Sequence, residues 1–251
     1  MPYKHGRPPI DTSLAFRLAS TLTYFAIIPI AFCANFMQHC TRFKHLWRLK
    51  NIPKAITVSN HTTFFDPVKI SVLSLPGQFY QTMLEATVES PFVGTLTRLL
   101  GGVPIPRGRT GYLKILESCR SSFKYRRFLH FYPEGECFLY NQNINKFQSG
   151  AFRLAAELDI PIVPMVTVFS NGLFKPWSFL GRSIPIETLI VMQAEYPSQY
   201  IRRDENGEIT NESLKDFADT IRKKMQNEID KNKGSNAFYR GQMKRIKGLN
   251  D

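Results

Sequence analysis

A histidine and an aspartate five positions apart are the residues of this chain best suited to acid–base chemistry. They stand in the stretch NHTTFFD at residues 60–66. An imidazole can take a proton from a hydroxyl near neutral pH, and a carboxylate can orient the ring and stabilise its charged form. The pair therefore predicts His61 as a general base and Asp66 as its partner. A simple helix start is the alternative, because aspartate before Pro67 is typical of an N-cap followed by the first helical residue.

The element that positions this pair is a short apolar run at residues 55–59, which reads as a buried strand. Side chains just beyond the end of such a strand are where α/β folds place their chemistry. Residues five apart on a regular helix lie about 140° apart, so they do not share a face. If His61 and Asp66 touch, a turn through residues 62–65 must join them, with His61 on the loop and Asp66 at or near a helix start.

Strand-like and helix-like segments alternate along the rest of the chain, which predicts an α/β fold. The further extended segments expected are 78–84, 103–107, 127–131, 160–168 and 188–194. The expected helices are 67–75, 91–100, 110–125, 149–158 and 211–232. Residues 170–186, which include Trp177, read as an aromatic loop that could dock on a bilayer, line an acyl path or pack in the core.

The N-terminal part carries an apolar segment, residues 18–37, without a charged residue. Its length of about 20 residues could cross a bilayer. Pro29 and several polar residues equally favour a helix lying in one leaflet, and a buried helix of a soluble protein is a third interpretation. Basic residues follow in the connector that ends near residue 54, with no acidic residue among them. We expect a membrane-associated helical segment at residues 1–50 and a catalytic domain at residues 51–251.

The formal net charge of +13 over 251 residues favours anionic partners such as anionic lipid or a phosphorylated substrate. Nucleic acid is not expected, because neither zinc-finger spacing nor an RNA-recognition signature is present. The four cysteines show no CxxC spacing, so neither a metal site nor a disulfide framework is expected.

Four separated motifs occur in the order found in the glycerolipid acyltransferases. Residues 60–66 resemble the HX4D box, and residues 102–107 (GVPIPR) resemble the second box. Residues 131–135 (FYPEG) are similar to the Phe-Pro-Glu-Gly box, and residues 160–164 (IPIVP) to the fourth. The resemblance covers about residues 51–170 and is closest to the 1-acylglycerol-3-phosphate (lysophospholipid) acyltransferases.

This resemblance implies an O-acyltransferase of phospholipid biosynthesis, with a mixed, largely parallel sheet flanked by helices. An acyl-CoA or acyl-carrier-protein thioester would be the donor, no further cofactor or metal is expected, and the hydroxyl of 1-acylglycerol-3-phosphate would be the acceptor. His61 and Asp66 would be catalytic. The substrate-binding residues expected are Asn60, for the oxyanion, and Arg107, Glu134, Gly135 and Lys146, for the acceptor. The protein would lie at the cytoplasmic face of the cytoplasmic membrane.

Two departures from the family pattern bear on the acceptor. Glu136 and Cys137 stand where the third box usually continues with Thr-Arg, and Glu85-Ala86 stands where basic residues are common. Loss of two cationic positions weakens a site for a phosphomonoester, while Glu85 and Glu136 would suit a cationic head group. A lyso-aminolipid is therefore the alternative acceptor. The same dyad could also serve transacylation between phospholipids without CoA, and the altered boxes leave a membrane-binding member without activity as a third hypothesis.

Overall fold

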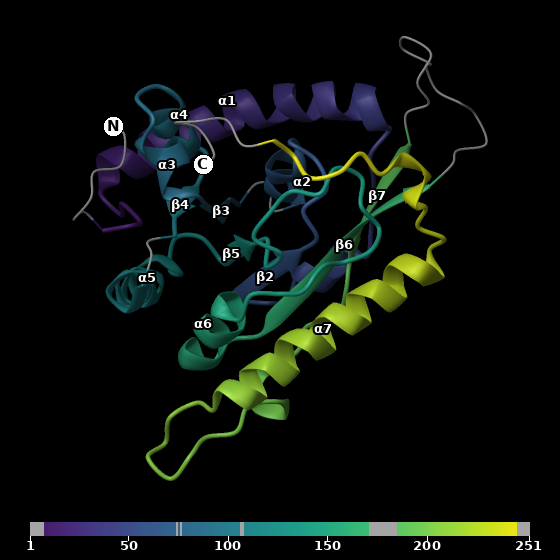
Figure 1. Ribbon diagram of the computed structural model, residues 1–251. Helices are drawn as coiled ribbons and strands as arrows, with labels where there is room; N and C mark the ends of the chain where they lie inside the picture. The colour runs from purple at the N-terminus through teal and green to yellow at the C-terminus, as the bar shows by residue number, and fades with distance from the viewer. Residues whose placement is uncertain (1–7, 74, 76, 106–107, 171–184, 245–251) are drawn as a thin grey trace.

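A seven-stranded sheet forms the centre of the part of the chain that the structure describes (Figure 1). The computed structural model describes residues 8–73, 75, 77–105, 108–170 and 185–244. The strands are β1 (Arg42–Lys44), β2 (Ala55–Ser59), β3 (Phe79–Met83), β4 (Gly102–Pro104), β5 (Phe128–Phe131), β6 (Ile162–Ser170) and β7 (Ile186–Val191). Their order is β1-β7-β6-β2-β5-β3-β4, and the pairs are parallel except for antiparallel β6 and β7. The predicted mixed, largely parallel sheet is confirmed.

Helices cover both faces of this sheet (Figure 1). They are α1 (Leu14–His39), α2 (Asp66–Leu73), α3 (Glu85–Glu89), α4 (Val93–Leu99), α5 (Gly108–Ser122), α6 (Gly150–Leu158) and α7 (Asn211–Lys231), with short 3₁₀ turns at Leu46–Leu49, Pro197–Gln199 and Asn236–Phe238. The larger apolar core joins the sheet to α5, α6 and α7, and a smaller one lies under α2. The central strand β2 is buried at every position, as expected for a parallel strand covered on both faces.

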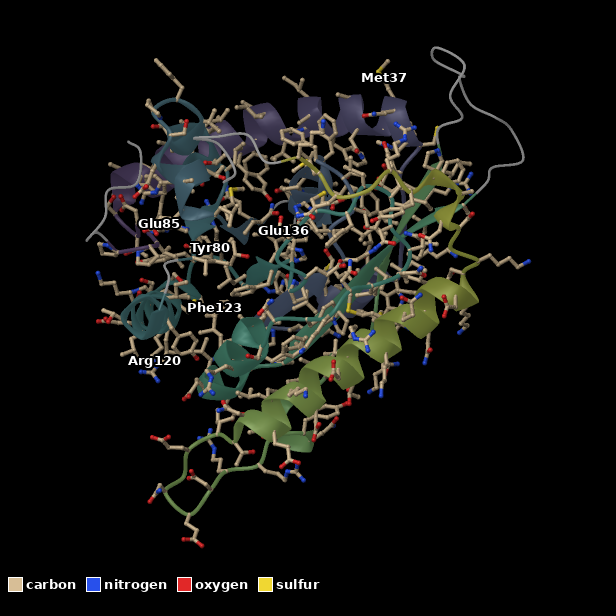
Figure 2. All side chains as sticks on the ribbon, in the orientation of Figure 1. Met37, Tyr80, Glu85, Arg120, Phe123 and Glu136 are labelled. Carbon is tan, nitrogen blue, oxygen red and sulfur yellow. The ribbon has the colours of Figure 1, made fainter. Side chains whose placement is uncertain are left out.

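Helix α1 lies across the domain and packs against α2 and α4 (Figure 1). The buried face of α1 carries Ser20, Tyr24, Ile28, Asn35 and His39. The hydroxyl of Tyr24 donates to the carbonyl of Ser71 in α2 at 2.8 Å. On the opposite side of the helix, Met37 points away from the sheet (Figure 2). Helix α1 therefore has one face bound to the domain and one face open.

Several short elements differ from the sequence prediction. Strand β1 lies within the expected connector and pairs with β7, so the sheet begins before residue 51. Helix α3 lies between the strand expected at residues 78–84 and the helix expected at residues 91–100, where no element was predicted, and the latter helix is shorter. Strand β7 begins at Ile186, within the expected aromatic loop, most of which (residues 171–184, with Trp177) lies outside the described residues. Elements of three to five residues depend on tertiary pairing more than on their own sequence.

Candidate active site

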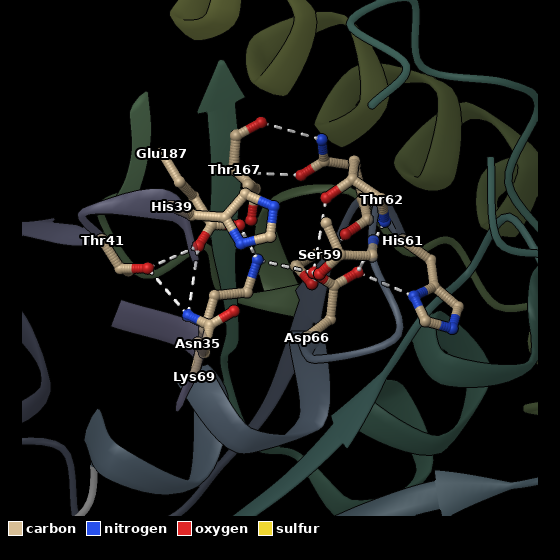
Figure 3. Close-up of polar contacts among 12 residues, drawn as sticks. Asn35, His39, Thr41, Ser59, His61, Thr62, Asp66, Lys69, Thr167 and Glu187 are labelled. Carbon is tan, nitrogen blue, oxygen red and sulfur yellow. Dashed lines mark hydrogen bonds and ion pairs between the residues drawn. The ribbon is translucent and has the colours of Figure 1, made fainter. Parts of the chain in front are cut away.

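His61 and Asp66 meet at the carboxyl end of β2. His61 is the second residue after the strand, and Asp66 is the first residue of α2. The Nδ1 atom of His61 lies 2.8 Å from Oδ2 of Asp66 (Figure 3). The intervening loop turns back on itself, because the Asp66 N–H donates to the carbonyl of Thr63 at 3.2 Å. The turn that the five-residue spacing requires is therefore observed.

Asp66 is buried, with 2% of its side chain exposed, and both of its oxygens accept hydrogen bonds. Oδ2 accepts from the backbone N–H groups of Thr62 and Thr63 at 2.5 and 2.9 Å. Oδ1 accepts from the Thr63 hydroxyl at 2.8 Å and pairs with the Lys69 ammonium at 2.6 Å. Burial alone would raise the pKa of Asp66, but Lys69 and His61 outweigh burial and hold this pKa well below its ordinary value.

The ionised Asp66 decides which nitrogen of His61 is basic. A carboxylate can only accept hydrogen bonds, so Nδ1 of His61 must carry the proton. The lone pair is then on Nε2, the ring nitrogen that points away from Asp66 (Figure 3). His61 keeps 19% of its side chain exposed, so this dyad can meet a substrate while its carboxylate stays buried.

The ring of Tyr132 fixes the plane of this imidazole. The two rings stack with centroids 4.1 Å apart and an interplanar angle of 21°. Tyr132 also contacts His130, with ring centroids 4.6 Å apart and an interplanar angle of 75°. Burial lowers the pKa of His130 to about 3, so His130 is a neutral wall of the site. Sequence reasoning did not assign a role to either ring, although both stand in or next to the third motif.

Glu134 holds the backbone of the loop that carries His61. Its carboxylate accepts from the His61 N–H at 3.1 Å, and from the backbone and side-chain N–H groups of Asn145 at 3.0 Å each. Burial raises the pKa of Glu134, and these hydrogen bonds oppose the rise. Gly135 follows with φ +76°, a left-handed conformation that glycine adopts without strain. The third motif thus connects the end of β5 to the loop that carries His61.

Asn60 braces two neighbouring strands. Its Oδ1 accepts from the Thr167 N–H at 2.8 Å, and its Nδ2 donates to the Thr167 carbonyl at 3.1 Å. Asn60 is 1% exposed. These contacts join the end of β2 to β6, and the predicted contact of Asn60 with an oxyanion stays a prediction.

The residues expected to bind the acceptor are only partly placed. Arg107 lies outside the described residues. Lys146 is exposed, next to the Asn145 that contacts Glu134. Glu85 begins α3, and Glu136 follows the Gly135 turn. The acceptor-binding roles of Arg107, Lys146, Glu134 and Gly135 stay predictions.

A buried ion pair behind the dyad was not found by sequence reasoning. Lys69 of α2 contacts Asp66 on one side and Glu187 of β7 on the other (Figure 3). A lysine on a helix is usually solvated, so its residue type alone does not predict a buried position. Its signal in the sequence was its position between Val68 and Ile70, three residues after Asp66.

The described residues form a further cavity away from the dyad, and they form no metal site. A cavity of about 580 Å³ lies between residues 8–13, Arg98 and α5, and the dyad does not line it. Among the described residues, no group of three or more His, Cys, Asp or Glu side chains could hold a metal ion. All four cysteines are free thiols.

The fold and the dyad together define an α/β enzyme site that can activate a hydroxyl group by general-base catalysis. A family model described as Acyltransferase matches residues 42–168, and the chain belongs to this family. The resemblance to the glycerolipid acyltransferases, drawn from four motifs, is confirmed.

Similar proteins include 1-acyl-sn-glycerol-3-phosphate acyltransferases of plants and an alga. The chain is 31% identical over 134 residues to a chloroplastic one from Brassica napus, covering 51% of this chain and 38% of that protein. It is 29% identical over 143 residues to one from Chlamydomonas reinhardtii, covering 57% and 42%. The chain spans about two-fifths of the length of these curated relatives.

A solved structure shares the fold. The crystal structure of the 1-acyl-sn-glycerophosphate (LPA) acyltransferase PlsC from Thermotoga maritima superimposes with a TM-score of 0.53. The match covers 87% of this chain and 97% of that chain, at 15% sequence identity. At that identity the likeness shows the architecture alone.

Proposed function

We propose that the protein transfers a fatty acyl group from a thioester donor to the hydroxyl of a lysophospholipid, with 1-acylglycerol-3-phosphate as the acceptor. The observation that carries this proposal is the His61–Asp66 pair, in contact at 2.8 Å at the carboxyl end of the central strand. The printed names of the plant and algal relatives support the choice of acceptor.

The dyad can perform this reaction without a covalent acyl-enzyme. Nε2 of His61 takes the proton of the acceptor hydroxyl while its oxygen attacks the thioester carbonyl carbon. A C–O bond forms, the carbonyl electrons move to oxygen, and their return breaks the C–S bond. The departing thiolate takes the proton from the imidazolium, which regenerates His61. Asp66 stabilises the imidazolium between these steps because it remains ionised.

The open face of α1 is suited to a lipid bilayer. By length and composition this helix could cross a membrane, but Ser20, Tyr24, Ile28 and Asn35 are buried in contacts along its inner side. We therefore favour a helix that lies in one leaflet while its inner face stays on the domain. Its exposed large apolar residues are Leu14, Leu18, Leu22, Phe25, Ile30, Phe36 and Met37. The donor thioester would then be met at the cytoplasmic face of the membrane.

Purified protein on liposomes is expected to convert 1-acylglycerol-3-phosphate and acyl-CoA to phosphatidate with release of one CoA thiol per ester formed. Thin-layer chromatography of labelled lipid and a thiol reagent measure the two products. Acyl-carrier-protein thioester, and lysophospholipids with zwitterionic or amino head groups, are the parallel arms. If 1-acylglycerol-3-phosphate is acylated at less than a tenth of the rate of another acceptor, that other acceptor is the substrate.

A different outcome would replace the thioester mechanism altogether. If labelled acyl chains exchange between phospholipids while acyl-CoA is not consumed, the enzyme is a transacylase. If the protein binds liposomes and no acyl transfer occurs with any donor and acceptor, it is a membrane-binding member without activity.

Aspartate on the open face of α1 is expected to weaken membrane binding. Leu22 is 74% exposed, so Leu22→Asp should leave the fold unchanged. A leucine side chain that enters the bilayer contributes about 1.5–3 kcal/mol to binding. Its loss should lower the partition coefficient of the protein on anionic liposomes about tenfold or more. Co-sedimentation with liposomes measures this coefficient.

Leu113 provides the matched control, since it is an exposed leucine of α5, a helix that lies away from α1 (Figure 1). Leu113→Asp should bind liposomes as the unaltered protein does. Equal binding by the unaltered protein, Leu22→Asp and Leu113→Asp would mean that the open face of α1 does not contact lipid.

A further inference from the structure

Lys69 is a cation that lies almost entirely out of solvent. Its side chain is 1% exposed and sits between Asp66 and Glu187, which are 2% and 0% exposed. Nζ is 2.6 Å from Oδ1 of Asp66 and also donates to Oε1 of Glu187. Burial would lower the pKa of Lys69, but these two carboxylates outweigh burial and raise it, so Lys69 is charged.

Glu187 in turn accepts hydrogen bonds from Asn35, near the C-terminal end of α1, and from Thr41, which lies two residues beyond that helix. The hydroxyl of Thr41 donates to Oε2 of Glu187 at 2.7 Å, and Asn35 approaches the same oxygen at 3.5 Å (Figure 3). The Asn35 amide also donates to the Thr41 hydroxyl at 2.8 Å. A continuous polar path therefore runs from the apolar helix through Glu187 and Lys69 to Asp66.

The placement of this lysine has consequences for the dyad. Lys69 occupies Oδ1 of Asp66, so Oδ2 is the oxygen left to face His61. A lone ammonium so close to Asp66 would also offset the charge that stabilises a protonated imidazole. Glu187, in contact with the far side of the ammonium, opposes that effect. Three buried charges of alternating sign thus leave one net negative charge behind His61.

We propose that Lys69 and Glu187 are positioning residues of the acyltransferase site: Lys69 fixes the orientation of Asp66, and Glu187 balances the lysine so that His61 remains an effective base. This inference rests on the proposed function. It also joins the seating of α1 on the domain to the state of the dyad, because Asn35 and Thr41 hold Glu187.

Titratable groups from the neighbouring elements surround Asp66 and Lys69. They are His39 from α1, Glu187 from β7, His130 from β5, and His61, Tyr132, Cys137 and Tyr140 from the loops. Of the charged groups in contact with Asp66 or Lys69, only Lys69 and Glu187 are altered in the test below.

The test is the pH dependence of kcat/KM in Lys69→Met and Glu187→Gln. Loss of the lysine leaves Asp66 without its cation and favours protonated imidazole, so the acid limb should move to higher pH by about one unit. Loss of the Glu187 charge leaves Lys69 less balanced and disfavours protonated imidazole, so the limb should move to lower pH by a similar amount. The double variant should lie between the two single variants.

A matched control is available on the other face of the sheet. Nζ of Lys224 in α7 lies 2.6 Å from Oε1 of Glu195, the same distance as that between Lys69 and Asp66. Lys224→Met should leave the acid limb where it is in the unaltered protein. Unfolding midpoints of all variants, followed by circular dichroism, report the stability separately from the pH profile.

The outcomes separate this inference from the proposed function. If the unaltered protein transfers no acyl group, the proposed function has failed before the variants are read. If it is active and the acid limbs of both single variants coincide with its own, the positioning role is wrong and the ion pair is structural only. If Lys69→Met does not fold, the direction of the shift in Glu187→Gln decides the question.

Discussion

Replacing His61 by alanine is expected to lower the rate of acyl transfer about 10³-fold or more, while the protein remains folded. The substitution removes the group that takes the hydroxyl proton, and general-base catalysis alone contributes about 10²–10⁴-fold. The remaining contacts of Asp66 with Thr62, Thr63 and Lys69 stay in place. Initial rates on liposomes measure the loss, and a denaturant titration should show a change of only about 1 kcal/mol.

His45 offers the control for this experiment, because it is an exposed histidine with φ +61°. Asparagine tolerates that left-handed conformation, so His45→Asn keeps the backbone unstrained. This variant should transfer acyl groups at the rate of the unaltered protein. Turnover by His61→Ala within a factor of ten of that rate would mean that another group is the base.

The dyad could be predicted because its determinants are local. The strand at residues 55–59, the five-residue spacing and Pro67 all lie within thirteen consecutive residues, numbers 55–67. They were sufficient to predict that His61 and Asp66 lie in contact, as the structure shows; with three further motifs they also predict the roles of general base and partner. The ends of α2, α6 and α7 could be predicted within about two residues for the same reason, since helix periodicity and caps are read from neighbouring positions.

The supporting residues could not be predicted because their partners are distant in the chain. Glu187 contacts Lys69 across 118 positions, and its strand β7 is placed by antiparallel pairing with β6. Asn60 had the right chemistry for an oxyanion, but its amide meets Thr167, 107 positions away. The residues flanking Lys69 indicate at most that it could be buried, and no residue near Lys69 or Asn60 in the chain identifies Glu187 or Thr167 as the partner, so sheet topology had to be known first.

Replacing Asp66 by asparagine is expected to lower the rate about 10³-fold and the free energy of unfolding by about 3 kcal/mol. Lys69 and the Thr63 hydroxyl both donate to Oδ1, so the amide oxygen of asparagine must take that position. The amide NH₂ would then face the N–H groups of Thr62 and Thr63, and also Nδ1 of His61. Nδ1 could only accept from this NH₂, so the proton would move to Nε2 and the ring would lose its base.

Rates and denaturant titrations at pH 7 measure both effects, with Asp216→Asn as the control. Asp216 is 64% exposed and its nearest cationic atom, on Arg202, is 3.4 Å away. An exposed pair of this kind contributes less than about 1 kcal/mol, so this control should be close to the unaltered protein in rate and stability. A rate for Asp66→Asn equal to that of the control would remove Asp66 from the mechanism.

The loss of stability in Asp66→Asn should also depend on pH in one direction. The pKa of Asp66 in the folded protein lies below its value of about 4 in the unfolded chain, so the carboxylate stabilises the fold above that value. As the pH falls below about 4, protonation of the unfolded chain removes this contribution from the unaltered protein. The difference in unfolding free energy between the two proteins should therefore be full at pH 7 and narrow below pH 4. A constant difference across this range would mean that asparagine destabilises the protein through packing, with the ionised carboxylate contributing nothing.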